Sequence, residues 1–578
     1  MADQKLFSEH VYSAEFQEEF KKHWHSQSDF KSANLEIISK PFKICRISNF
    51  LRDKSFIENL KSELKRHHHV RKVLDLFQFE KTEDLIYALD KHIRMLSRSF
   101  RNDLASWMNR NTNIELNGKV LMSSARYRHT DHLLCHDDNM VDRRIAYILY
   151  LTDDWSEEYG GTLDLFDTDE RGSPRKVVKS LIPEYNSLVF FEVVDNSYHQ
   201  VAEVLARGKC RWSINGWFHG PLEKYFHKSH RYESKTFVEP DSTEVNLHSW
   251  ISDSYLVPSI MKQIQEDVAV SSYTFLEDFL KESMYQEIAN NLTSRDIGWR
   301  MAGPPDIRHY EIADEQTLPK LLKDFCDLFR SISFFQLLKK YTGLDLVPEE
   351  TKRPKMTLEL QRWSSGCYTL LYDKSLMKDC SDETIKADRP DDDVSVDNTA
   401  APARASTSDF STDEINFDTN ETRRELKRER IDDSPSQANS SDKKKIARYL
   451  DSQSDVSMQL SSKNEHVSDM ETSSSSDEKS RSGTPISNSE DESASKNGEF
   501  LLDVIIQFHT QDAKGIPKTE DTIDFVDPGE EDGILIKVPT QDNHLCLVYR
   551  SLMICRLQKY LTHLYDGYSY TFICTYYE

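Results

Sequence analysis

The sequence predicts an α+β protein with a mainly β core, built from two tandem copies of one helix-flanked β-barrel domain. One observation is an internal repeat in the helical regions. Asn49-Phe50-Leu51 opens a helical pattern, Asp278-Phe279-Leu280 opens a similar one, and residues 112–116 match residues 342–346 after the next helical stretch. Repetition of a whole structural unit is the sequence signature of a duplicated architecture.

The repeat continues through the predicted strands. Residues 133–136 are answered by residues 369–372, and residues 213–218 by residues 572–577. Residues 213–218 and 572–577, which lie near the C-terminal ends of the two predicted copies, alternate as barrel strands do. We therefore expect the second barrel to end close to the last residue of the sequence.

These patterns divide the chain into four parts. We expect an N-terminal tail or helix over residues 1–30 and a first barrel domain over residues 31–240. The second barrel domain would comprise residues 241–373 and 499–578, interrupted by an acidic, Ser-rich insert over residues 374–498.

The insert has the composition of a disordered segment. Its only aromatic residues are Phe410, Phe417 and Tyr449, so it cannot bury enough apolar surface to offset its ordering entropy. Basic clusters at residues 423–428 and 443–445 are spaced as in a bipartite nuclear-import signal. We expect the chain in the nucleus and cytoplasm, with charge balance inside an acidic tract as the alternative interpretation.

Composition narrows the class of protein further. The 578 residues suffice for several domains, and neither a leader-like start nor a run of about 18 apolar residues predicts secretion or membrane spanning. Nine scattered Cys indicate reduced thiols rather than a disulfide framework. The formal net charge of −24 argues against direct nucleic-acid binding and favours a basic partner.

One short pattern carries metal chemistry. His136 and Asp138 lie two positions apart directly after Leu133-Leu134-Cys135, and in an extended strand such residues share one face. His199 is the candidate third ligand. Two imidazoles and one carboxylate leave positions open on an octahedral ion, as in non-haem Fe(II) oxygenases.

Chance alternatives exist, because the chain has 20 His and 98 acidic residues. His129-Thr130-Asp131 has the same spacing, but it lies in a polar stretch, whereas His136 follows apolar residues. His67-His68-His69 could chelate a metal, yet consecutive residues do not share one helix face, and an exposed helix end is the better interpretation.

A candidate carboxylate anchor follows His199. In the stretch from Arg211 to Asn215, the alternate residues Arg211, Ser213 and Asn215 fall on one face of a predicted strand. Arg can hold a carboxylate through two parallel hydrogen bonds, and Ser adds a neutral one. This pair suits the far end of a dicarboxylate co-substrate.

With these residues in view, the chain resembles the iron- and 2-oxoglutarate-dependent prolyl hydroxylases. Among them it is most similar to the eukaryotic prolyl 3-hydroxylases that modify a small-subunit ribosomal protein at the decoding centre. The resemblance covers nearly the whole chain apart from the insert. It rests on six blocks in order, at residues 130–138, 143–151, 160–165, 179–183, 188–193 and 216–221.

The resemblance implies a fold and a metal site. Both barrels would be double-stranded β-helix (jelly-roll) domains, with residues 31–240 as the catalytic one. Fe(II) would be bound by His136, Asp138 and His199, which favours this triplet over the one at 129–131. O₂ would be the oxidant, and ascorbate would keep the iron reduced.

The resemblance also implies the co-substrate pocket. Arg211 would bind the distal carboxylate of 2-oxoglutarate, and Tyr150 would donate its hydroxyl to the same group. Leu133 and Ser213 would line the pocket. Gly160-Gly161 would lie at the lip of the active site, where absence of Cβ permits close approach of a peptide backbone.

The implied activity is 3-hydroxylation of a proline in a small-subunit ribosomal protein, with effects on translation accuracy and termination. Translation-termination and mRNA-decay factors are further candidate partners. Two alternatives stay open: an oxygenase acting on another basic protein or RNA, and a non-enzymatic interaction protein of translation or mRNA decay. The sequence leaves open the oligomeric state and whether one or two hydroxyls are added.

The second barrel is predicted to be degenerate. Matching the two halves pairs His136 with Tyr372 and Asp138 with Lys374. The same matching pairs Arg211 with Tyr570, and counting back along the chain pairs His199 with Gln558. None of these residues completes a ligand set, so we expect one iron per chain and a structural or substrate-recognition role for the second barrel.

Overall fold

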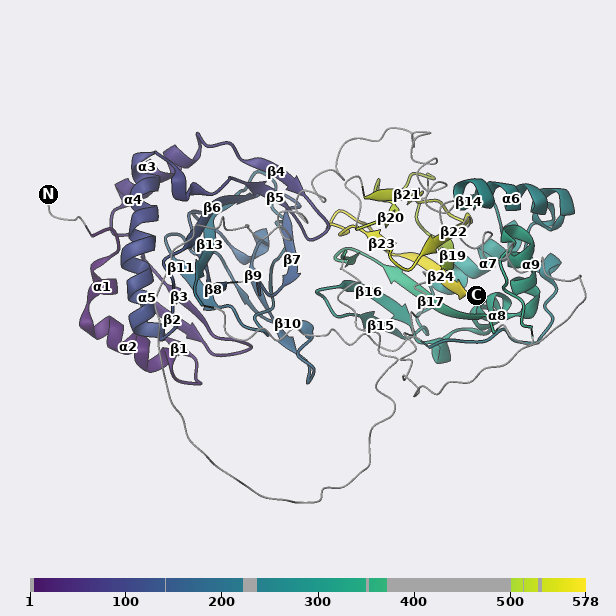
Figure 1. Cartoon of the computed structure of the whole chain (residues 1–578), viewed down its shortest axis with the longest axis horizontal. Coiled ribbons are helices and arrows are strands. Elements are labelled where there is room, and N and C mark those ends of the chain that lie inside the picture. Colours follow the sequence, from purple (N-terminus) through teal and green to yellow (C-terminus); the bar gives the residue numbers. More distant parts are fainter. Residues whose placement is uncertain are drawn as a thin grey trace, which may run out of the picture.

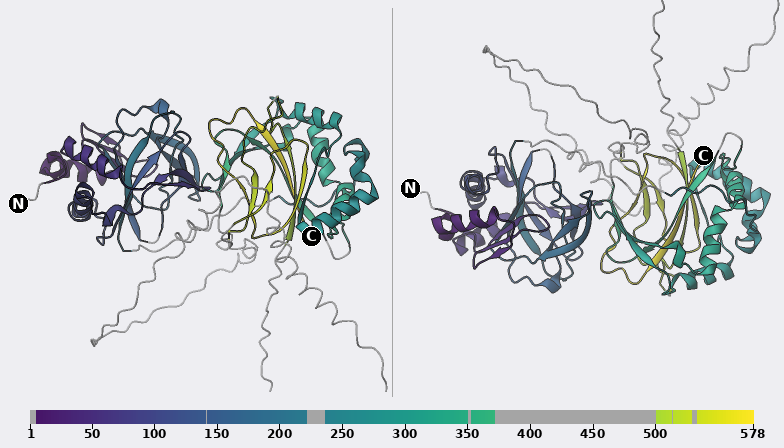
Figure 2. Two further views of the ribbon diagram at one scale, coloured as in Figure 1. Left: turned by 90° about the horizontal axis from the view of Figure 1, so that it is seen from above. Right: turned by 90° about the horizontal axis from the view of Figure 1, so that it is seen from below.

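The chain forms two sheet-rich halves that lie side by side, each with its helices on the side away from the other half (Figures 1 and 2). This computed structural model describes residues 5–140, 142–221, 236–349, 353–371, 500–512, 514–528 and 533–578. Sheets with flanking helices give the α+β class predicted from the sequence. In these ranges, no helix is both long enough and apolar enough to span a bilayer. The insert lies outside the described residues.

The first half packs helices against one face of a curved sheet. Its helices are α1 (Glu9–Tyr12), α2 (Ala14–Trp24), α3 (Lys54–Leu64), α4 (Lys91–Ser99) and α5 (Ala105–Thr112), with short turns η1 (Leu85–Tyr87), η2 (Phe100–Leu104) and η3 (Glu157–Tyr159). Its strands are β1 (Phe30–Lys31), β2 (Leu35–Ile38), β3 (Ile44–Ile47), β4 (Val70–Val73), β5 (Phe77–Lys81), β6 (Val120–Tyr127), β7 (His132–His136), β8 (Arg143–Tyr150), β9 (Leu163–Thr168), β10 (Pro174–Leu181), β11 (Leu188–Glu192), β12 (His199–Val201) and β13 (Arg211–His219).

The second half has the same kinds of element. Its helices are α6 (Pro258–Ser271), α7 (Glu282–Leu292), α8 (Lys320–Arg330) and α9 (Ile332–Thr342), with short turns η4 (Leu247–Ser249), η5 (Asp253–Leu256) and η6 (Glu315–Thr317). Its strands are β14 (Tyr273–Leu276), β15 (Trp299–Ala302), β16 (Arg308–Ala313), β17 (Lys355–Trp363), β18 (Tyr368–Thr369), β19 (Phe500–Phe508), β20 (Ile523–Val526), β21 (Ile534–Val538), β22 (Leu545–Ser551), β23 (Cys555–Gln558) and β24 (Ser569–Tyr577).

The helices form where caps and apolar spacing favour them. Asp53 caps α3, because its side chain accepts a hydrogen bond of 2.8 Å from the amide of Ser55. Phe56, Leu60 and Leu64 then recur on one helix face and are buried. They join the largest core cluster of the first half, between the helices and the outer face of the sheet.

Strand β13 shows how alternation separates the core from the site. Trp212, Ile214 and Phe218 point to the helix side and join the core there. Arg211 and Ser213 point to the other face of the sheet and line a cavity there. The period of two read from the sequence therefore places the two candidate anchor residues together.

The two halves have corresponding strand orders. The first contains the neighbours β3-β11-β8-β13-β6-β5, and the second contains β14-β22-β19-β24-β17-β16. A second layer runs β12-β9-β10 in the first half and β23-β20-β21 in the second. Each strand of one series thus has a counterpart at the same place in the other.

The same pair of asparagine hydrogen bonds occurs in both halves, at the segment that opens each helical pattern. The side chain of Asn186 accepts from the amide of Leu51 and donates to its carbonyl, both at 2.9 Å. Asn543 makes the same pair of bonds to Leu280, both at 3.0 Å. These contacts tie the segments that open the two helical patterns, which the sequence had matched as a repeat.

Strand register corrects one predicted counterpart. Thr162 donates to Asp164 in β9, and Thr522 donates to Asp524 in β20, which aligns these two strands. His199 is then the Cα partner of Leu165, whereas the matching Phe525 is the partner of Arg556. The residue in the place of His199 is therefore Arg556, and the prediction of Gln558 was wrong.

The counterpart of Arg211 also changes. Leu188 follows Asn186 as Leu545 follows Asn543, and these leucines are the Cα partners of Leu149 and Ile506. Those two residues pair in turn with Ile214 of β13 and Phe572 of β24. Three positions earlier stand Arg211 and Ser569, so the prediction of Tyr570 was wrong. Tyr372 and Lys374 lie outside the described residues.

The halves touch through corresponding segments. The amide of Leu134 donates to Leu76, and the amide of Leu370 donates to Ile307 in the same relation. Asp75 accepts a hydrogen bond of 2.7 Å from the amide of Leu371 across the interface. Leu134, Tyr368 and Leu370 form one buried apolar cluster there, against which Leu76 and Tyr560 pack. Strand β7, which ends in His136, therefore lies at the contact between the halves.

Candidate metal and co-substrate site

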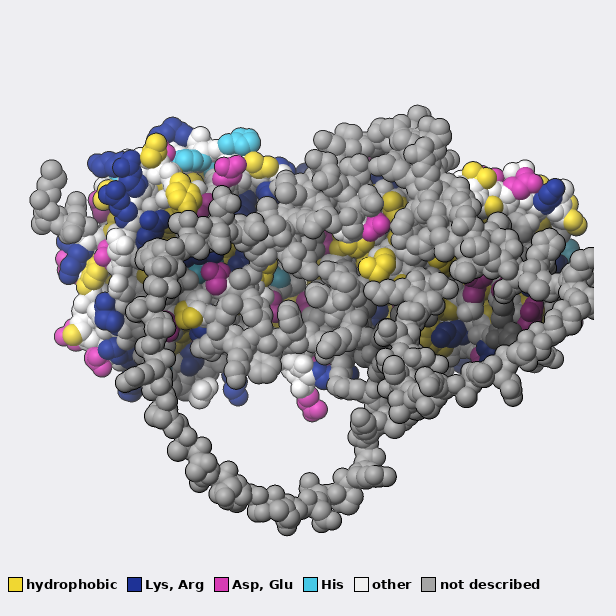
Figure 3. Space-filling model, viewed as in Figure 1, with side chains coloured by type: hydrophobic (Ala, Val, Ile, Leu, Met, Phe, Trp, Pro, Cys, Tyr) yellow, Lys and Arg dark blue, Asp and Glu magenta, His cyan; other side chains and the backbone are white. Residues whose placement is uncertain are grey.

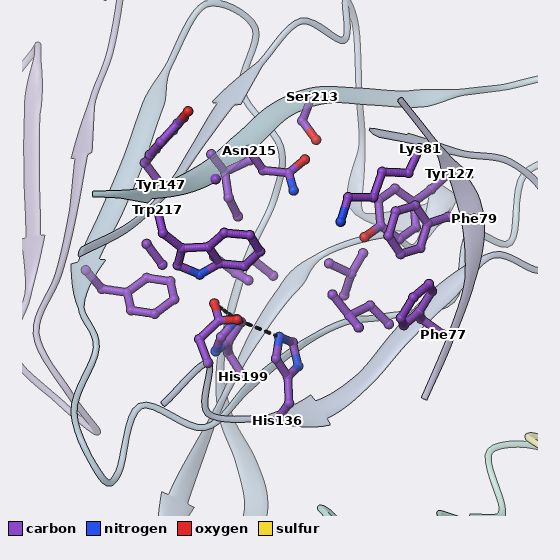
Figure 4. Close-up of a pocket in the computed structure, with 18 of the residues that line it drawn as sticks. Phe77, Phe79, Lys81, Tyr127, His136, Tyr147, His199, Ser213, Asn215 and Trp217 are labelled. Carbon is purple, nitrogen blue, oxygen red and sulfur yellow. Dashed lines mark ion pairs between the residues drawn. The ribbon is translucent and has the colours of Figure 1, made fainter. Parts of the chain in front are cut away.

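Three side chains meet at one end of a cavity lined by the strands of the first half. His136 ends β7, Asp138 follows two residues later with φ of 60°, and His199 begins β12 as the Cα partner of His136. Nε2 of His136 lies 3.7 Å from Oδ1 of Asp138, and Nε2 of His199 lies 3.6 Å from Oδ2 (Figure 4). Within the described ranges, this is the one group of three His, Cys, Asp or Glu side chains close enough to hold an ion.

Backbone carbonyls orient both imidazoles. Nδ1 of His136 lies 2.8 Å from the carbonyl of Leu134, and Nδ1 of His199 lies 2.8 Å from that of Ser197. Each carbonyl accepts an Nδ1 proton, which leaves the Nε2 lone pair available to a metal. Both rings are therefore held in the tautomer that a ligand requires.

The electrostatics of the cluster favour a cation bound by neutral imidazoles. Burial, with His136 beside it, lowers the pKa of His199 to about 4. Burial tends to raise the pKa of Asp138, but His136, His199 and Arg143 lower it overall. A neutral imidazole and an ionised carboxylate are the forms that bind metal.

Arg143 and Trp217 complete the wall near these three residues. Nη1 of Arg143 lies 3.4 Å from Oδ1 of Asp138. The same guanidinium lies 3.7 Å from the ring centroid of Trp217. Sequence analysis did not single out either residue, because nothing local in the chain relates them to His136.

The candidate anchor is a buried pair deeper in the cavity. Arg211 is 1% exposed, and Tyr150 is fully buried. Nε of Arg211 donates to the carbonyl of Gly161 at 2.7 Å, and Nη2 donates to the hydroxyl of Tyr150 at 3.2 Å. Because that hydroxyl accepts from Arg211, its own hydrogen is available to a carboxylate.

All seven predicted site residues line one cavity or its inner wall. The cavity contains about 840 Å³ of space free of protein atoms, part of it open solvent. Its lining includes His136, Asp138, His199, Arg211, Leu133 and Ser213. Tyr150 joins them through Arg211 and is the Cα partner of Ser213. The structure thus brings together residues that lie up to 80 positions apart in the sequence.

The cavity also contains Lys81, which sequence analysis missed, and Asn215, which the sequence placed on the same strand face as Arg211 and Ser213. Lys81, on β5, and Asn215 point into it between the metal ligands and Ser213 (Figure 4). Only the pairing of β5 with β6 brings Lys81 to this wall, so the local sequence carries no signal for it.

The residues fit a metal and a polar co-substrate. Oδ1 of Asn215 is buried in the cavity wall and lacks a hydrogen-bond partner among the described residues. Buried polar atoms cost free energy unless they are paired, so a polar ligand in this cavity would satisfy this amide oxygen. The donor set of two imidazoles and a carboxylate suits Fe(II).

The backbone conformation and the close surroundings of residues 160 and 161 both require glycine. Gly160 and Gly161 have positive φ, 68° and 65°. A Cβ on Gly160 would lie 2.1 Å from the carbonyl oxygen of Glu203, and one on Gly161 would lie 3.0 Å from Cδ of Arg211. The close approach that requires glycine here is made by the protein itself, whereas the sequence had suggested a substrate backbone.

The rival triplet has a structural role. Asp131 is fully buried and accepts hydrogen bonds from Arg71 and from the amide of Arg128. The ring of His129 packs edge-on against His563 of the second half, with centroids 4.9 Å apart. The two side chains are thus used in separate contacts.

His132 makes the contact between the halves sensitive to acid. It is 4% exposed and packs against the ring of Tyr560 at 4.2 Å, and burial lowers its pKa from 6.5 to about 4. As the pH falls, His132 is therefore protonated in the unfolded chain before it is protonated in the folded one. Stability is full above about pH 6.5 and falls towards pH 4 by at most about 3 kcal/mol.

We expect His132→Gln to remove part of that loss. Urea unfolding at about pH 7 and about pH 4.5 would show a smaller difference in unfolding free energy for the variant than for the natural chain. His68→Gln, at an exposed position, is the matched control and should keep the full difference. An unchanged difference in His132→Gln would contradict the assignment.

Comparison with known proteins agrees with this geometry. A model of the 2OG-Fe(II) oxygenase superfamily matches residues 122–219. A model described as oxoglutarate and iron-dependent oxygenase degradation C-term matches residues 242–400. The first range contains all seven predicted site residues.

Three relatives are named as prolyl hydroxylases. Prolyl 3-hydroxylase OGFOD1 of Mus musculus is 39% identical over 349 residues, which cover 59% of this chain and 62% of the mouse protein. Prolyl 3-hydroxylase OGFOD1 of Xenopus laevis is 36% identical over 381 residues, 61% of this chain and 74% of that protein. Prolyl 3,4-dihydroxylase OGFOD1 of Ostreococcus tauri is 31% identical, over 53% of this chain and 71% of that protein. The match thus spans less than two thirds of the mouse protein.

A curved sheet that presents two imidazoles and a carboxylate to one metal position, beside a buried arginine, is the arrangement of a non-haem iron oxygenase. This class dispenses with haem, because protein side chains alone hold the metal. The chain belongs to the prolyl 3-hydroxylase family of the 2OG-Fe(II) oxygenase superfamily. Its cofactors are Fe(II), 2-oxoglutarate and O₂.

Proposed function

We propose that this chain hydroxylates a prolyl residue of a protein at carbon 3, with Fe(II) bound by His136, Asp138 and His199. The observation that carries the proposal is the meeting of these three side chains in the cavity that also contains Arg211. The names of the relatives supply the reaction and the class of substrate.

Each site residue has a proposed task. Bound Fe(II) and 2-oxoglutarate supply the activation of O₂ and the oxidation of a C–H bond. Arg211 and Tyr150 bind the distal carboxylate of 2-oxoglutarate, and Ser213 adds a hydroxyl beside them. Leu133 provides apolar wall. Because Arg211, Tyr150 and Ser213 are buried, they orient the co-substrate and keep water from its far end.

The proposed substrate is a small-subunit ribosomal protein, modified at a proline of the decoding centre. The family resemblance suggests it, and the net charge of −24 favours a basic partner. Lys and Arg side chains gather over α3 and α4 (Figure 3), among them the exposed Lys91, Arg94 and Arg98. A basic substrate would be repelled there, so it should approach from another face.

We propose that residues 31–240 and the pair 241–373 with 499–578 are tandem double-stranded β-helix domains, the second without catalytic function. The corresponding strand orders support this, and Arg556 in the place of His199 would repel a metal ion. Ascorbate as reductant, location in nucleus and cytoplasm, and contacts with translation-termination or mRNA-decay factors belong to the same proposal.

The test is intact-mass measurement of small-subunit ribosomal proteins from cells with and without this chain. We expect one of these proteins to lose the mass of one oxygen atom when the chain is absent. The purified chain should restore that mass in the presence of Fe(II), 2-oxoglutarate and ascorbate, with formation of succinate. A gain of two oxygens would indicate dihydroxylation, and an unchanged profile would overturn the ribosomal substrate.

A further inference from the structure

The loop between β12 and β13 carries a buried carboxylate that faces the second half. Glu203 is 7% exposed, although Glu is seldom buried without partners. Among the described residues, the hydrogen-bond partners of its side chain come from the segment between β23 and β24, which is the corresponding loop of the second half. The two halves thus meet through equivalent loops at this point.

The partners of Glu203 hold both of its carboxylate oxygens. Oε2 accepts from the hydroxyl of Tyr560 at 3.2 Å and from the amide of His563 at 2.9 Å. Oε1 lies 2.8 Å from Nδ1 of His563. Hydrogen bonds to an ionised acceptor are stronger than neutral ones, so the second half fixes this side chain firmly.

The backbone of the same residue supports the glycine pair. The carbonyl of Glu203 accepts a hydrogen bond of 3.0 Å from the amide of Gly161, and the next residue, Val204, forms an isolated bridge with Gly160. A Cβ on Gly160 would lie 2.1 Å from that carbonyl oxygen, so the two segments are too close to leave room for a side chain at this position. A shift of Glu203 must therefore move the glycine pair.

The glycine pair in turn orients the anchor of the co-substrate. The carbonyl of Gly161 accepts a hydrogen bond of 2.7 Å from Nε of Arg211. Of the guanidinium, Nη2 contacts Tyr150, so these two bonds set its direction. A continuous series of hydrogen bonds thus runs from Tyr560 and His563, through Glu203 and Gly161, to Arg211.

We propose that Glu203 is a positioning residue through which the second half sets the affinity of the first for 2-oxoglutarate. This inference rests on the proposed function, because Arg211 must be the co-substrate anchor. The inference gives the second half a role in the reaction, although Arg556 stands there in the place of the metal ligand His199. The role acts on binding of the co-substrate, and the metal ligands lie on a different part of the cavity wall.

The test measures 2-oxoglutarate binding to the full chain loaded with Mn(II) in place of Fe(II), without O₂. We expect Glu203→Ala to raise the Kd about 10-fold and Tyr560→Phe about 3-fold, since each lost charge-assisted hydrogen bond loosens the Gly161 loop. Glu203→Gln, which keeps the shape and one acceptor, should fall between Glu203→Ala and the natural chain. With Fe(II) and saturating 2-oxoglutarate, kcat of Tyr560→Phe should stay within twofold while KM rises.

Two controls separate positioning from general destabilisation. Asp75→Ala removes a contact between the halves at Leu371 that is not part of the hydrogen-bond series to Arg211. It should lower the melting temperature yet leave the Kd for 2-oxoglutarate within twofold. An unchanged Kd in both Glu203→Ala and Tyr560→Phe, or an equal rise in Asp75→Ala, would overturn the inference.

Arg211→Ala separates this inference from the proposed function. If the natural chain binds 2-oxoglutarate and Arg211→Ala weakens binding while the Glu203 variants do not, the inference alone fails. If the natural chain with Mn(II) does not bind 2-oxoglutarate, the proposed function fails, and the positioning role fails with it.

Discussion

His136→Ala should lose its iron and its hydroxylase activity together. Nε2 of His136 and of His199 both face the carboxylate of Asp138, so removal of one imidazole leaves two ligands for the ion. Loss of partners outside the ligand set already costs about 10- to 100-fold in such sites, so we expect activity to fall by more than about 100-fold. Succinate release and iron content of the anaerobically purified chain measure the two effects.

His129→Ala is the matched control for this prediction. It removes the imidazole of the rival triplet, whose ring packs against His563. Iron should remain at one equivalent per chain in the control and fall to a small fraction of one in His136→Ala. Retention of iron by His136→Ala, or loss of iron from His129→Ala, would show that the ligand set is wrong. A natural chain with two equivalents would show a second metal site.

Arg211→Ala should raise the KM for 2-oxoglutarate by about 30-fold or more, because truncation of one partner of a buried charged contact costs about 2–5 kcal/mol. Arg211 is 1% exposed and bonded to Gly161 and Tyr150, so few other cations can take its place. Arg211→Lys keeps the charge but loses the planar fork and should lie between Arg211→Ala and the natural chain.

Initial rates at varied 2-oxoglutarate concentration, with iron content in parallel, measure the effect. Arg207→Ala, an exposed arginine four residues earlier, is the matched control and should leave KM unchanged. Iron should stay at one equivalent in both variants. If Arg211→Ala lowers iron content as much as His136→Ala does, the side chain supports the metal site and is not a separate co-substrate anchor.

The sequence predicted which residues form the site more accurately than it predicted which residues correspond between the two halves. Side chains two positions apart share a face of any strand, so His136 with Asp138, and Arg211 with Ser213, could be grouped without coordinates. The repeat was visible because Asn49 to Leu51 and Asp278 to Leu280 do the same structural work in both halves. Neither grouping depends on how distant strands pair.

The pairing of residues across the repeat depends on the lengths of the loops between strands, and the pairing made from the sequence was wrong at these positions. Twelve residues separate His199 from Arg211, but thirteen separate Arg556 from Ser569, because the second loop is one residue longer. The count also started at Tyr570, one position beyond Ser569, so it reached Gln558, which lies on β23 two positions beyond Arg556. Lys81 was missed for a related reason, since long-range strand pairing brings it to the cavity.

The contacts between Leu134 and Leu370, and between Asp75 and Leu371, have a consequence for assembly. Two equivalent segments that face each other across one surface reproduce the geometry of a symmetric dimer, in which residue i meets j and j meets i. Here both partners belong to one polypeptide. The chain thus covers with its own second half the surface through which a single barrel of this kind could pair with another copy.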